Sequence, residues 1–263
     1  MDFGIRNKRA LVFGASRGLG RATALQLAQE GCDLVLVART QASLKQLADS
    51  LSETYGICCQ WLALDTTDKH ALHHLLDYLD DAELHIDILV NISGGPSIGS
   101  ALNTPSTEFT MAFDAMVGFF IELSRILGQR MVNAQWGRIV TVTSSGVIKP
   151  IPELVISNTL RSALTNWMNT FAQELAASGV TVNCIVPGRI HTERVNEIDA
   201  MRATKQGITI AQQAERSQAS IPMKRYGTER EFAATVAFLV SEPAGYITAS
   251  SVRVDGGLVN RYD

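Results

Sequence analysis

Residues 9–31 read RALVFGASRGLGRATALQLAQEG, and this stretch decides the fold. A short apolar run ends at Gly14, a turn with three glycines follows, and apolar residues then recur at the spacing of a helix. Glycines allow a tight turn and a close approach of the backbone to a ligand. The free N–H groups and the positive dipole end of the helix suit a phosphate. The stretch therefore predicts a strand, a phosphate-binding turn and a helix.

The remainder of the chain repeats this alternation of strand and helix. Between the apolar runs lie segments with helical spacing, such as residues 160–175. Parallel strands need crossover connections, so the pattern predicts a parallel sheet with helices on both faces. We expect one doubly wound α/β domain of about seven strands, at residues 9–14, 33–38, 58–64, 86–91, 138–144, 181–186 and 251–255.

Length, composition and charge limit the classes of function. The 263 residues, 46% of them hydrophobic, suit one large domain, and no linker or repeat divides residues 1–263. The net charge of −3 gives no reason to expect nucleic acid or an anionic membrane as a partner, so we expect a small-molecule substrate. The N-terminal segment has no small-residue cleavage site and no apolar run approaches a membrane span. These features predict a cytoplasmic protein.

Cysteine and histidine spacing indicates no metal site. The four cysteines show no CxxC spacing and are interpreted as small core residues. His70, His73 and His74 lie three and four positions apart in a helical stretch, so a metal-binding face is conceivable. A solvated helix surface is the preferred interpretation, and we predict no bound metal.

Two arginines near the glycine turn bear on the choice of cofactor. A site selective for NAD usually has an acidic residue near the end of the second strand, but here Arg39 stands there. Arg39, with Arg17 from the glycine turn, forms a pair suited to a 2′-phosphate and so predicts NADP(H). The alternative is two solvated arginines.

Polar residues also close the third and fourth predicted strands. Asp65 is placed to accept a hydrogen bond from an adenine amino group. Asn91, with Gly94 behind it, either holds neighbouring loops together or lines the adenosine pocket. An ordinary turn at a strand end explains Asn91 equally well.

Five segments, taken in order, resemble the short-chain dehydrogenase/reductase family. They are GASRGLG (14–20), NISG (91–94), GRIVTVTSS (137–145), VPGRIHT (186–192) and VDGG (254–257). The resemblance implies a Rossmann domain and a homo-oligomer, dimer or tetramer, built through the two long helices that flank the serine strand. It implies that NADP(H) is bound by Gly14, Ser16, Arg17, Gly18, Leu19, Gly20, Arg39, Asp65, Asn91, Gly94, Pro187, Gly188, Ile190 and Thr192.

The same resemblance places Ser144 at the family's catalytic serine, but three other positions depart from the family. The tyrosine falls at Ser157, the lysine at Arg161 and the proton-relaying asparagine at Met116. In the family, lysine lowers the tyrosine pKa from about 10 towards neutrality, which corresponds to about 4 kcal/mol. A serine hydroxyl holds its proton far more tightly than a phenol does, about as tightly as water, so the same shift needs several times as much free energy. Ser157 therefore cannot replace the tyrosine as an acid.

Arg161 is suited to binding rather than to proton transfer. Its guanidinium stays protonated, and its fork of donors can hold the nicotinamide ribose hydroxyls or a substrate carboxylate or phosphate. His191 and Lys149, which follow predicted strands, are candidate replacement proton donors or ordinary surface residues.

The first functional prediction is an NADP(H)-dependent oxidoreductase acting on a small carbonyl or alcohol, similar to 3-oxoacyl reductases but with an atypical site. Ser144 would polarise the substrate, with Ser157 and Arg161 orienting ligand and cofactor. One alternative is reduction of a conjugated C=C bond, where the enolate needs only donors such as Ser144 and Ser157. The other is a catalytically silent NADP(H)-binding sensor or partner subunit.

Residues 192–222 fall between the sixth strand and the next helix, and they are rich in helix formers. In the family that it resembles, this insert covers the substrate. We expect a mobile lid here, because the insert carries few large apolar anchors.

Overall fold

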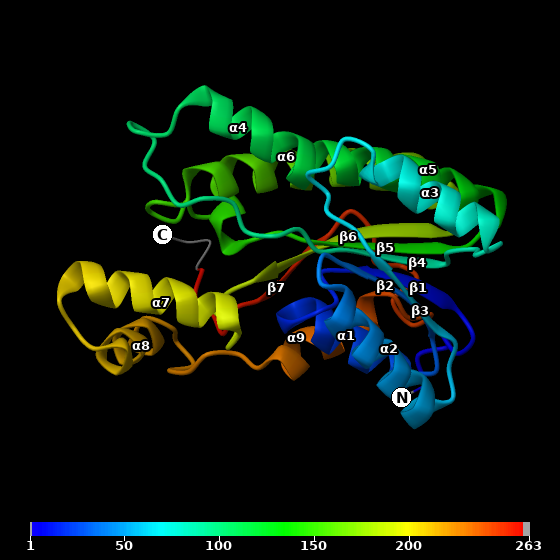
Figure 1. Ribbon diagram of the computed structural model, residues 1–263, viewed down its shortest axis with the longest axis horizontal. Helices are drawn as coiled ribbons and strands as arrows, with labels where there is room; N and C mark the ends of the chain where they lie inside the picture. The colour runs from blue at the N-terminus through cyan, green and yellow to red at the C-terminus, as the bar shows by residue number, and fades with distance from the viewer. Residues whose placement is uncertain (1, 260–263) are drawn as a thin grey trace.

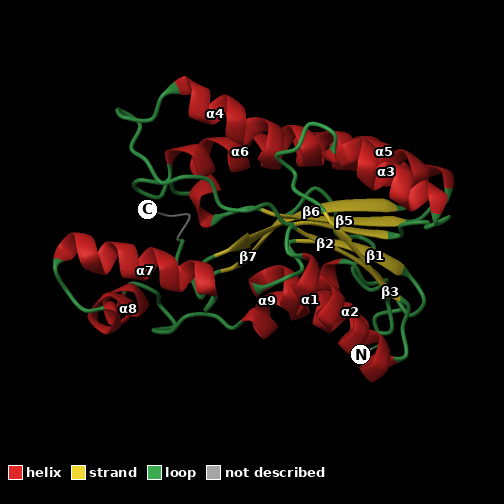
Figure 2. Cartoon of the chain, in the orientation of Figure 1, coloured by secondary structure: helices red, strands yellow, loops and turns green. Residues whose placement is uncertain are grey.

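The computed structural model describes residues 2–259 and contains one sheet of seven parallel strands (Figures 1 and 2). Each strand lies within two residues of the apolar run that predicted it, so the predicted fold class is confirmed. The strands are β1 (Arg9–Phe13), β2 (Asp33–Ala38), β3 (Cys59–Ala63), β4 (Ile88–Asn91), β5 (Gly137–Val142), β6 (Val180–Pro187) and β7 (Ser251–Val254).

Helices cover both faces of the sheet, as the parallel pairing requires (Figure 1). On one face lie α1 (Gly18–Gln29), α2 (Gln41–Tyr55) and α9 (Glu229–Leu239). On the other lie α3 (Ala71–Asp81), α4 (Ser106–Phe113), α5 (Phe119–Asn133) and α6 (Val155–Leu175). Each face has its own buried apolar core, and Phe13, Phe119 and Phe120 meet edge-to-face in one of them.

The strand order β3-β2-β1-β4-β5-β6-β7 places the binding crevice. Strand β1 pairs with β2 on one side and with β4 on the other. From β1 the chain first adds β2 and β3 on one side, and then returns to add β4 on the other side of β1. The loops after β1 and β4 therefore diverge at the carboxyl ends of these two strands. Ligands of such sheets bind at this switch point.

The insert after β6 forms two helices, α7 (Glu193–Gln206) and α8 (Ile210–Ala219), beside the carboxyl end of the sheet (Figure 1). A buried polar cluster fastens them. Asp199 of α7, only 1% exposed, accepts hydrogen bonds from Arg189 at 2.8 Å and from the Tyr226 hydroxyl at 2.5 Å. Ser217 of α8 donates to the same carboxylate at 3.3 Å. Within the described residues, no helix is long and apolar enough to span a membrane.

Candidate active site

The glycine turn between β1 and α1 has the geometry of an anion cradle. Gly14 and Gly18 have φ of +63° and +56°, which glycine adopts without strain. At Gly20 a Cβ atom would lie 2.2 Å from the Gly14 carbonyl oxygen, so only glycine fits. Helix α1 begins at Gly18, and no side chain caps its first N–H groups. These N–H groups, which include that of Leu19, and the neighbouring Ser16 in the turn are available to a phosphate.

The two arginines of the predicted clamp occupy different surroundings. Arg17 is exposed and lies 3.4 Å from both Glu193 and Glu197 of α7. Arg39 is exposed just after β2 and lies near Asp65. The pKa of Asp65 is lowered by hydrogen bonds from Thr67 and, to a smaller extent, by the charge of Arg39. Exposed ion pairs such as those of Arg17 contribute at most about 1 kcal/mol, so exchanging them for a phosphate costs little.

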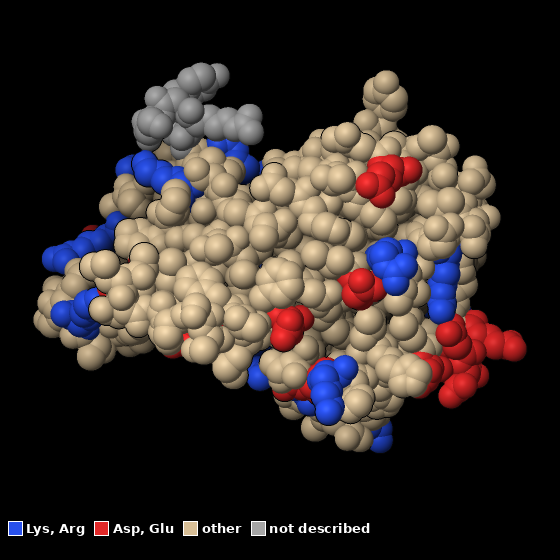
Figure 3. Space-filling view, turned by 90° about the horizontal axis from the view of Figure 1, so that it is seen from above, with Lys and Arg blue, Asp and Glu red and all other residues tan. Residues whose placement is uncertain are grey.

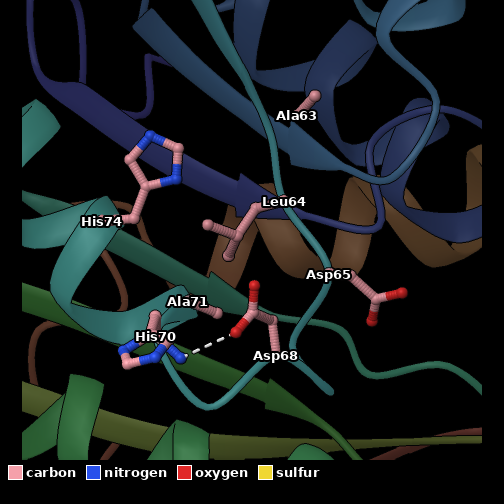
Figure 4. A pocket seen from close by; sticks show the side chains of 7 residues that line it. All are labelled: Ala63, Leu64, Asp65, Asp68, His70, Ala71 and His74. Atoms are coloured by element: carbon pink, nitrogen blue, oxygen red, sulfur yellow. Dashed lines mark hydrogen bonds between the residues drawn. The ribbon is translucent and has the colours of Figure 1, made fainter.

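Asp65 borders a pocket at the end of β3. This pocket, of about 280 Å³, is lined by Ala63, Leu64, Asp65, Asp68, His70, Ala71 and His74 (Figure 4). The Asp68 carboxylate accepts a hydrogen bond from the His70 backbone N–H at 2.9 Å. His73 pairs with Asp77 instead, and residues 2–259 hold no group of side chains arranged for a metal.

Asn91 and Gly94, at and beyond the end of β4, have different surroundings. Asn91 is 1% exposed, and its amide donates to Ser124 of α5 and to Thr141 of β5, each at 3.1 Å. Its side chain therefore ties β4 to its neighbours. Gly94, three residues on, is exposed, and its carbonyl accepts from Arg161 at 3.3 Å.

The loop after β6 returns to the glycine turn. Pro187 ends the strand, and a Cβ at Gly188 would lie 2.7 Å from the Asp255 backbone, so glycine is needed for this approach. Ile190 is buried. Thr192 caps α7 by accepting from the Val195 N–H, and its methyl carbon lies 3.8 Å from an ideal Cβ at Gly18. The start of α7 thus borders the phosphate cradle.

Ser144 stands two residues beyond β5, at the start of a short 3-10 turn (Ser145–Val147). Its hydroxyl oxygen accepts from the Gly146 N–H at 3.1 Å. The hydroxyl hydrogen has no acceptor among the described residues and can be donated to a ligand.

Ser157 and Arg161 lie one turn apart on α6 and are 8% and 9% exposed. The guanidinium donates through Nε to the Ser157 hydroxyl at 3.3 Å, and through Nη1 to the Val142 carbonyl at 2.9 Å. Arg161 therefore joins α6 to the end of β5 and to the loop after β4. No carboxylate of residues 2–259 pairs with it, and burial, with the nearby Arg194 cation, lowers the pKa of Arg161 to about 10.

Met116, at the position of the family's asparagine, lies in a five-residue π-helical segment (Asp114–Gly118) between α4 and α5. Met116 and its neighbour Ala115 are both buried. Neither side chain has a group that exchanges protons, so this helix provides no relay. π-Helical turns frequently occur beside functional sites.

The candidate proton donors His191 and Lys149 are both exposed. The His191 ring lies 6.3 Å from that of Tyr226, on the side of the insert, and its backbone N–H donates to Gly227. Lys149 lies beyond the 3-10 turn that Ser144 begins. The structure thus joins Ser157 and Arg161 to the end of β5, two residues before Ser144, whereas the His191 ring lies on the side of the insert.

Sequence reasoning missed Arg194, in the first turn of α7. Its Nη2 reaches the Pro96 carbonyl at 3.5 Å, and its guanidinium lies 3.1 Å from an ideal Cβ at Gly95. Arg194 and Arg161 therefore both donate hydrogen bonds to the loop after β4, Arg194 from α7 and Arg161 from α6. Arg194 lies in the segment PGRIHTER, directly after the loop that follows β6. The sequence alone does not show that α7 brings this arginine to the loop after β4.

Comparison with known proteins extends over nearly the whole chain. Residues 14–259 match the family model described as "Enoyl-(Acyl carrier protein) reductase". The NADPH-dependent reductase BacG of Bacillus subtilis is 29% identical, over 95% of this chain and 97% of its own. The 3-oxoacyl-[acyl-carrier-protein] reductase FabG of Salmonella typhimurium is 30% identical, over 95% and 97%. L-Sorbose reductase of Gluconobacter frateurii, solved with NADPH and L-sorbose, superposes with a TM-score of 0.93 at 29% identity, over 99% of both chains.

Proposed function

Because the chain belongs to the short-chain dehydrogenase/reductase family, we propose that it is an NADP(H)-dependent reductase of small carbonyl compounds with an atypical active site. The observation that carries this proposal is the hydrogen bonding of two serine hydroxyl groups. Ser144 and Ser157 each accept a hydrogen bond from an N–H group, at 3.1 and 3.3 Å. Each oxygen is thereby polarised, and each hydrogen is left to donate to a substrate oxygen.

The cofactor proposal rests on the glycine turn and on Arg39. The turn and the start of α1 would hold the pyrophosphate, and Arg39 with Arg17 would hold the 2′-phosphate. Pro187, Gly188, Ile190 and Thr192 would border the nicotinamide half, and Asp65 the adenine. Two of the three relatives compared are described with NADPH, which supports this choice. The bound cofactor would supply a hydride from its nicotinamide ring.

Ser144, Ser157 and Arg161 would stabilise the negative charge that the hydride creates on the substrate oxygen. Two O–H donors and a permanent cation act on it from the end of β5 and from α6. None of the three is a suitable acid, since a serine hydroxyl holds its proton too tightly and the guanidinium remains charged. The proton that completes the reaction would come from water, or from His191 or Lys149 after a movement of either side chain.

Two kinds of carbonyl compound fit this site. Direct reduction of a C=O bond, the reaction class named for FabG, leaves an alkoxide that must gain a proton. Hydride addition to a C=C bond conjugated to the carbonyl leaves an enolate, which hydrogen-bond donors stabilise and which water can protonate later. The combination of two hydroxyls and a guanidinium favours the second reaction, and the family model's description supports it.

The insert formed by α7 and α8, within residues 192–222, would cover the substrate. Its first turn borders the cradle at Thr192 and reaches the loop after β4 through Arg194. The face formed by α4, α5 and α6 carries few charged side chains at its centre (Figure 3), which supports the expected homodimer or homotetramer. The cytoplasmic location stays a prediction.

The decisive experiment follows NADPH oxidation with matched pairs of a saturated ketone and its conjugated enone. We expect turnover with NADPH and a higher kcat/KM for the enone of each pair. Ser157→Ala should lower kcat for the enone about a hundredfold, as loss of an oxyanion donor does, without changing the Kd for NADPH. Asn166→Ala, at an exposed position of α6, is the control and should leave both values unchanged. Tight NADPH binding without turnover of any pair would instead identify a sensor or partner subunit.

A further inference from the structure

The environment of Arg161 is unusual because no carboxylate among residues 2–259 pairs with this buried cation. The guanidinium is 9% exposed, yet its three hydrogen-bond partners, Ser157, Val142 and Gly94, are all neutral. A buried charge without an opposite charge is costly, even when neutral groups hydrogen-bond to it. These three bonds also occupy only part of a guanidinium that has five N–H groups.

A second guanidinium increases this positive charge. Arg194 approaches the loop after β4 from the insert, and its partner carbonyl, Pro96, lies two residues beyond the carbonyl that Arg161 holds. The nearest carboxylate, Glu197, lies 3.2 Å from Arg194 but also 3.4 Å from Arg17, so two guanidiniums share it. Among the described residues, the ion pairs of Arg17 and Arg194 are made with Glu193 and Glu197, and neither carboxylate pairs with Arg161.

We propose that Arg161 and Arg194 form an anion subsite across residues 94–96, and that the substrate carries a carboxylate. This inference rests on the proposed function, since it names the substrate class of that site. Arg161 also contacts Ser157 and the strand that leads to Ser144, so the anion would lie close to the reacting carbonyl. The fitting compounds are small oxo acids and their conjugated unsaturated relatives. A carboxylate would form charge-assisted bonds with both guanidiniums and neutralise the buried charge.

Arg194 suits the test because its side chain is 43% exposed, so its loss should not unfold the protein. Arg194→Gln removes the charge but keeps a donor. Arg216→Gln, at an exposed position of α8 in the same insert, removes an arginine whose side chain donates a hydrogen bond to Gln206 at 3.1 Å, and is the matched control.

Binding is measured first, by calorimetry on the full chain saturated with NADP⁺, so that no hydride is available. The probes are 2-oxobutanoate and 4-oxopentanoate, each beside its methyl ester. We expect at least one acid to bind at least tenfold more tightly than its ester. Arg194→Gln should raise the Kd of that acid at least tenfold and leave the ester within twofold, whereas Arg216→Gln should change neither.

Turnover with NADPH, measured on these pairs and on (E)-4-oxopent-2-enoate beside its methyl ester, separates this inference from the proposed function. Acid-selective binding without hydride transfer to any of these compounds would retain the subsite and reject the reductase. Turnover without any preference for the acids would retain the reductase and overturn the subsite. A tenfold higher Kd for NADPH in Arg194→Gln, with the ratio of acid to ester unchanged, would assign the anion to the cofactor's phosphates and overturn it as well.

Discussion

Gly20 lies where the first helix meets the first strand, and the contact leaves no space for a methyl group. Gly20→Ala would place its Cβ 2.2 Å from the Gly14 carbonyl oxygen. We expect a loss of about 3 kcal/mol in the free energy of unfolding, measured in urea, and a loss of NADPH binding, because the turn must open. Gly94→Ala is the control for stability, since a Cβ there meets nothing within 4 Å and should cost less than about 0.5 kcal/mol.

Arg39 carries the proposed choice between the two dinucleotides. Arg39→Asp would replace a 2′-phosphate ligand by a residue that repels this phosphate and can accept from a ribose hydroxyl. The Kd for NADPH should rise at least tenfold, and the Kd for NADH should fall or stay unchanged, both measured by fluorescence titration. Equal affinities of the native protein for NADH and NADPH would reject the arginine clamp.

At the residue scale, local positions were predictable and distant contacts were not. The glycine turn and Ser144 each follow a strand. The end of an apolar run is visible in the sequence itself, and so is the glycine spacing after β1. Arg161 was expected to bind, but its partners come from two other segments, near residues 94 and 142. Arg194 was missed because its role depends on where α7 lies after folding, which no local pattern specifies.

At the scale of elements, the insert is held by polar contacts rather than by an apolar core. Asp199→Asn would weaken the pair with Arg189, whose side chain is 18% exposed, and would disturb the bonds from Tyr226 and Ser217. We expect a cost of order 3 kcal/mol, concentrated in α7 and α8, since breaking one partner of a buried pair leaves a charge uncompensated.

Hydrogen exchange measures this effect by region. Amides of residues 193–219 should exchange faster in Asp199→Asn, whereas those of β1 and β5 should not change. Glu215→Gln, an exposed change on α8, should match the native protein. Unchanged protection of α7 in Asp199→Asn would mean that other contacts fasten the insert.

The insert showed only a richness in helix formers, whereas the strands were predictable because their apolar runs are regular. The π-helical segment at Asp114–Gly118 was not, because a single wider turn leaves no distinct pattern in the sequence. The sequence alone placed Met116 where a relay residue stands in the family. The structure adds that the helix geometry also changes at this point.

For the whole molecule, cofactor binding should stabilise the fold, because both halves of the sheet contribute to the site. NADPH at a hundred times its Kd should add about 2.7 kcal/mol to the free energy of unfolding. The unfolding temperature should then rise by roughly 5–10 °C, as measured by calorimetry. NADH at the same concentration should produce a smaller rise. An unchanged unfolding temperature with both dinucleotides would contradict the proposed cofactor site.

The layered sheet was predictable because every level of the sequence agrees with it: apolar runs, helical spacing and the glycine turn all indicate the same fold. The substrate was not predictable, since the proposed site combines Ser144 beyond β5 with side chains of α6 and α7 that approach one another only in the folded chain.

The position of β1 between β2 and β4 has a consequence for synthesis on the ribosome. Residues 9–13 leave the exit tunnel before the other six strands and find β2 soon afterwards, but their second neighbour begins only at Ile88. Until then a growing chain carries β1 with one edge of unpaired amides and carbonyls beside apolar side chains, a template for wrong pairing. The translation of about eighty residues is therefore the interval in which a nascent chain of this protein most needs a chaperone.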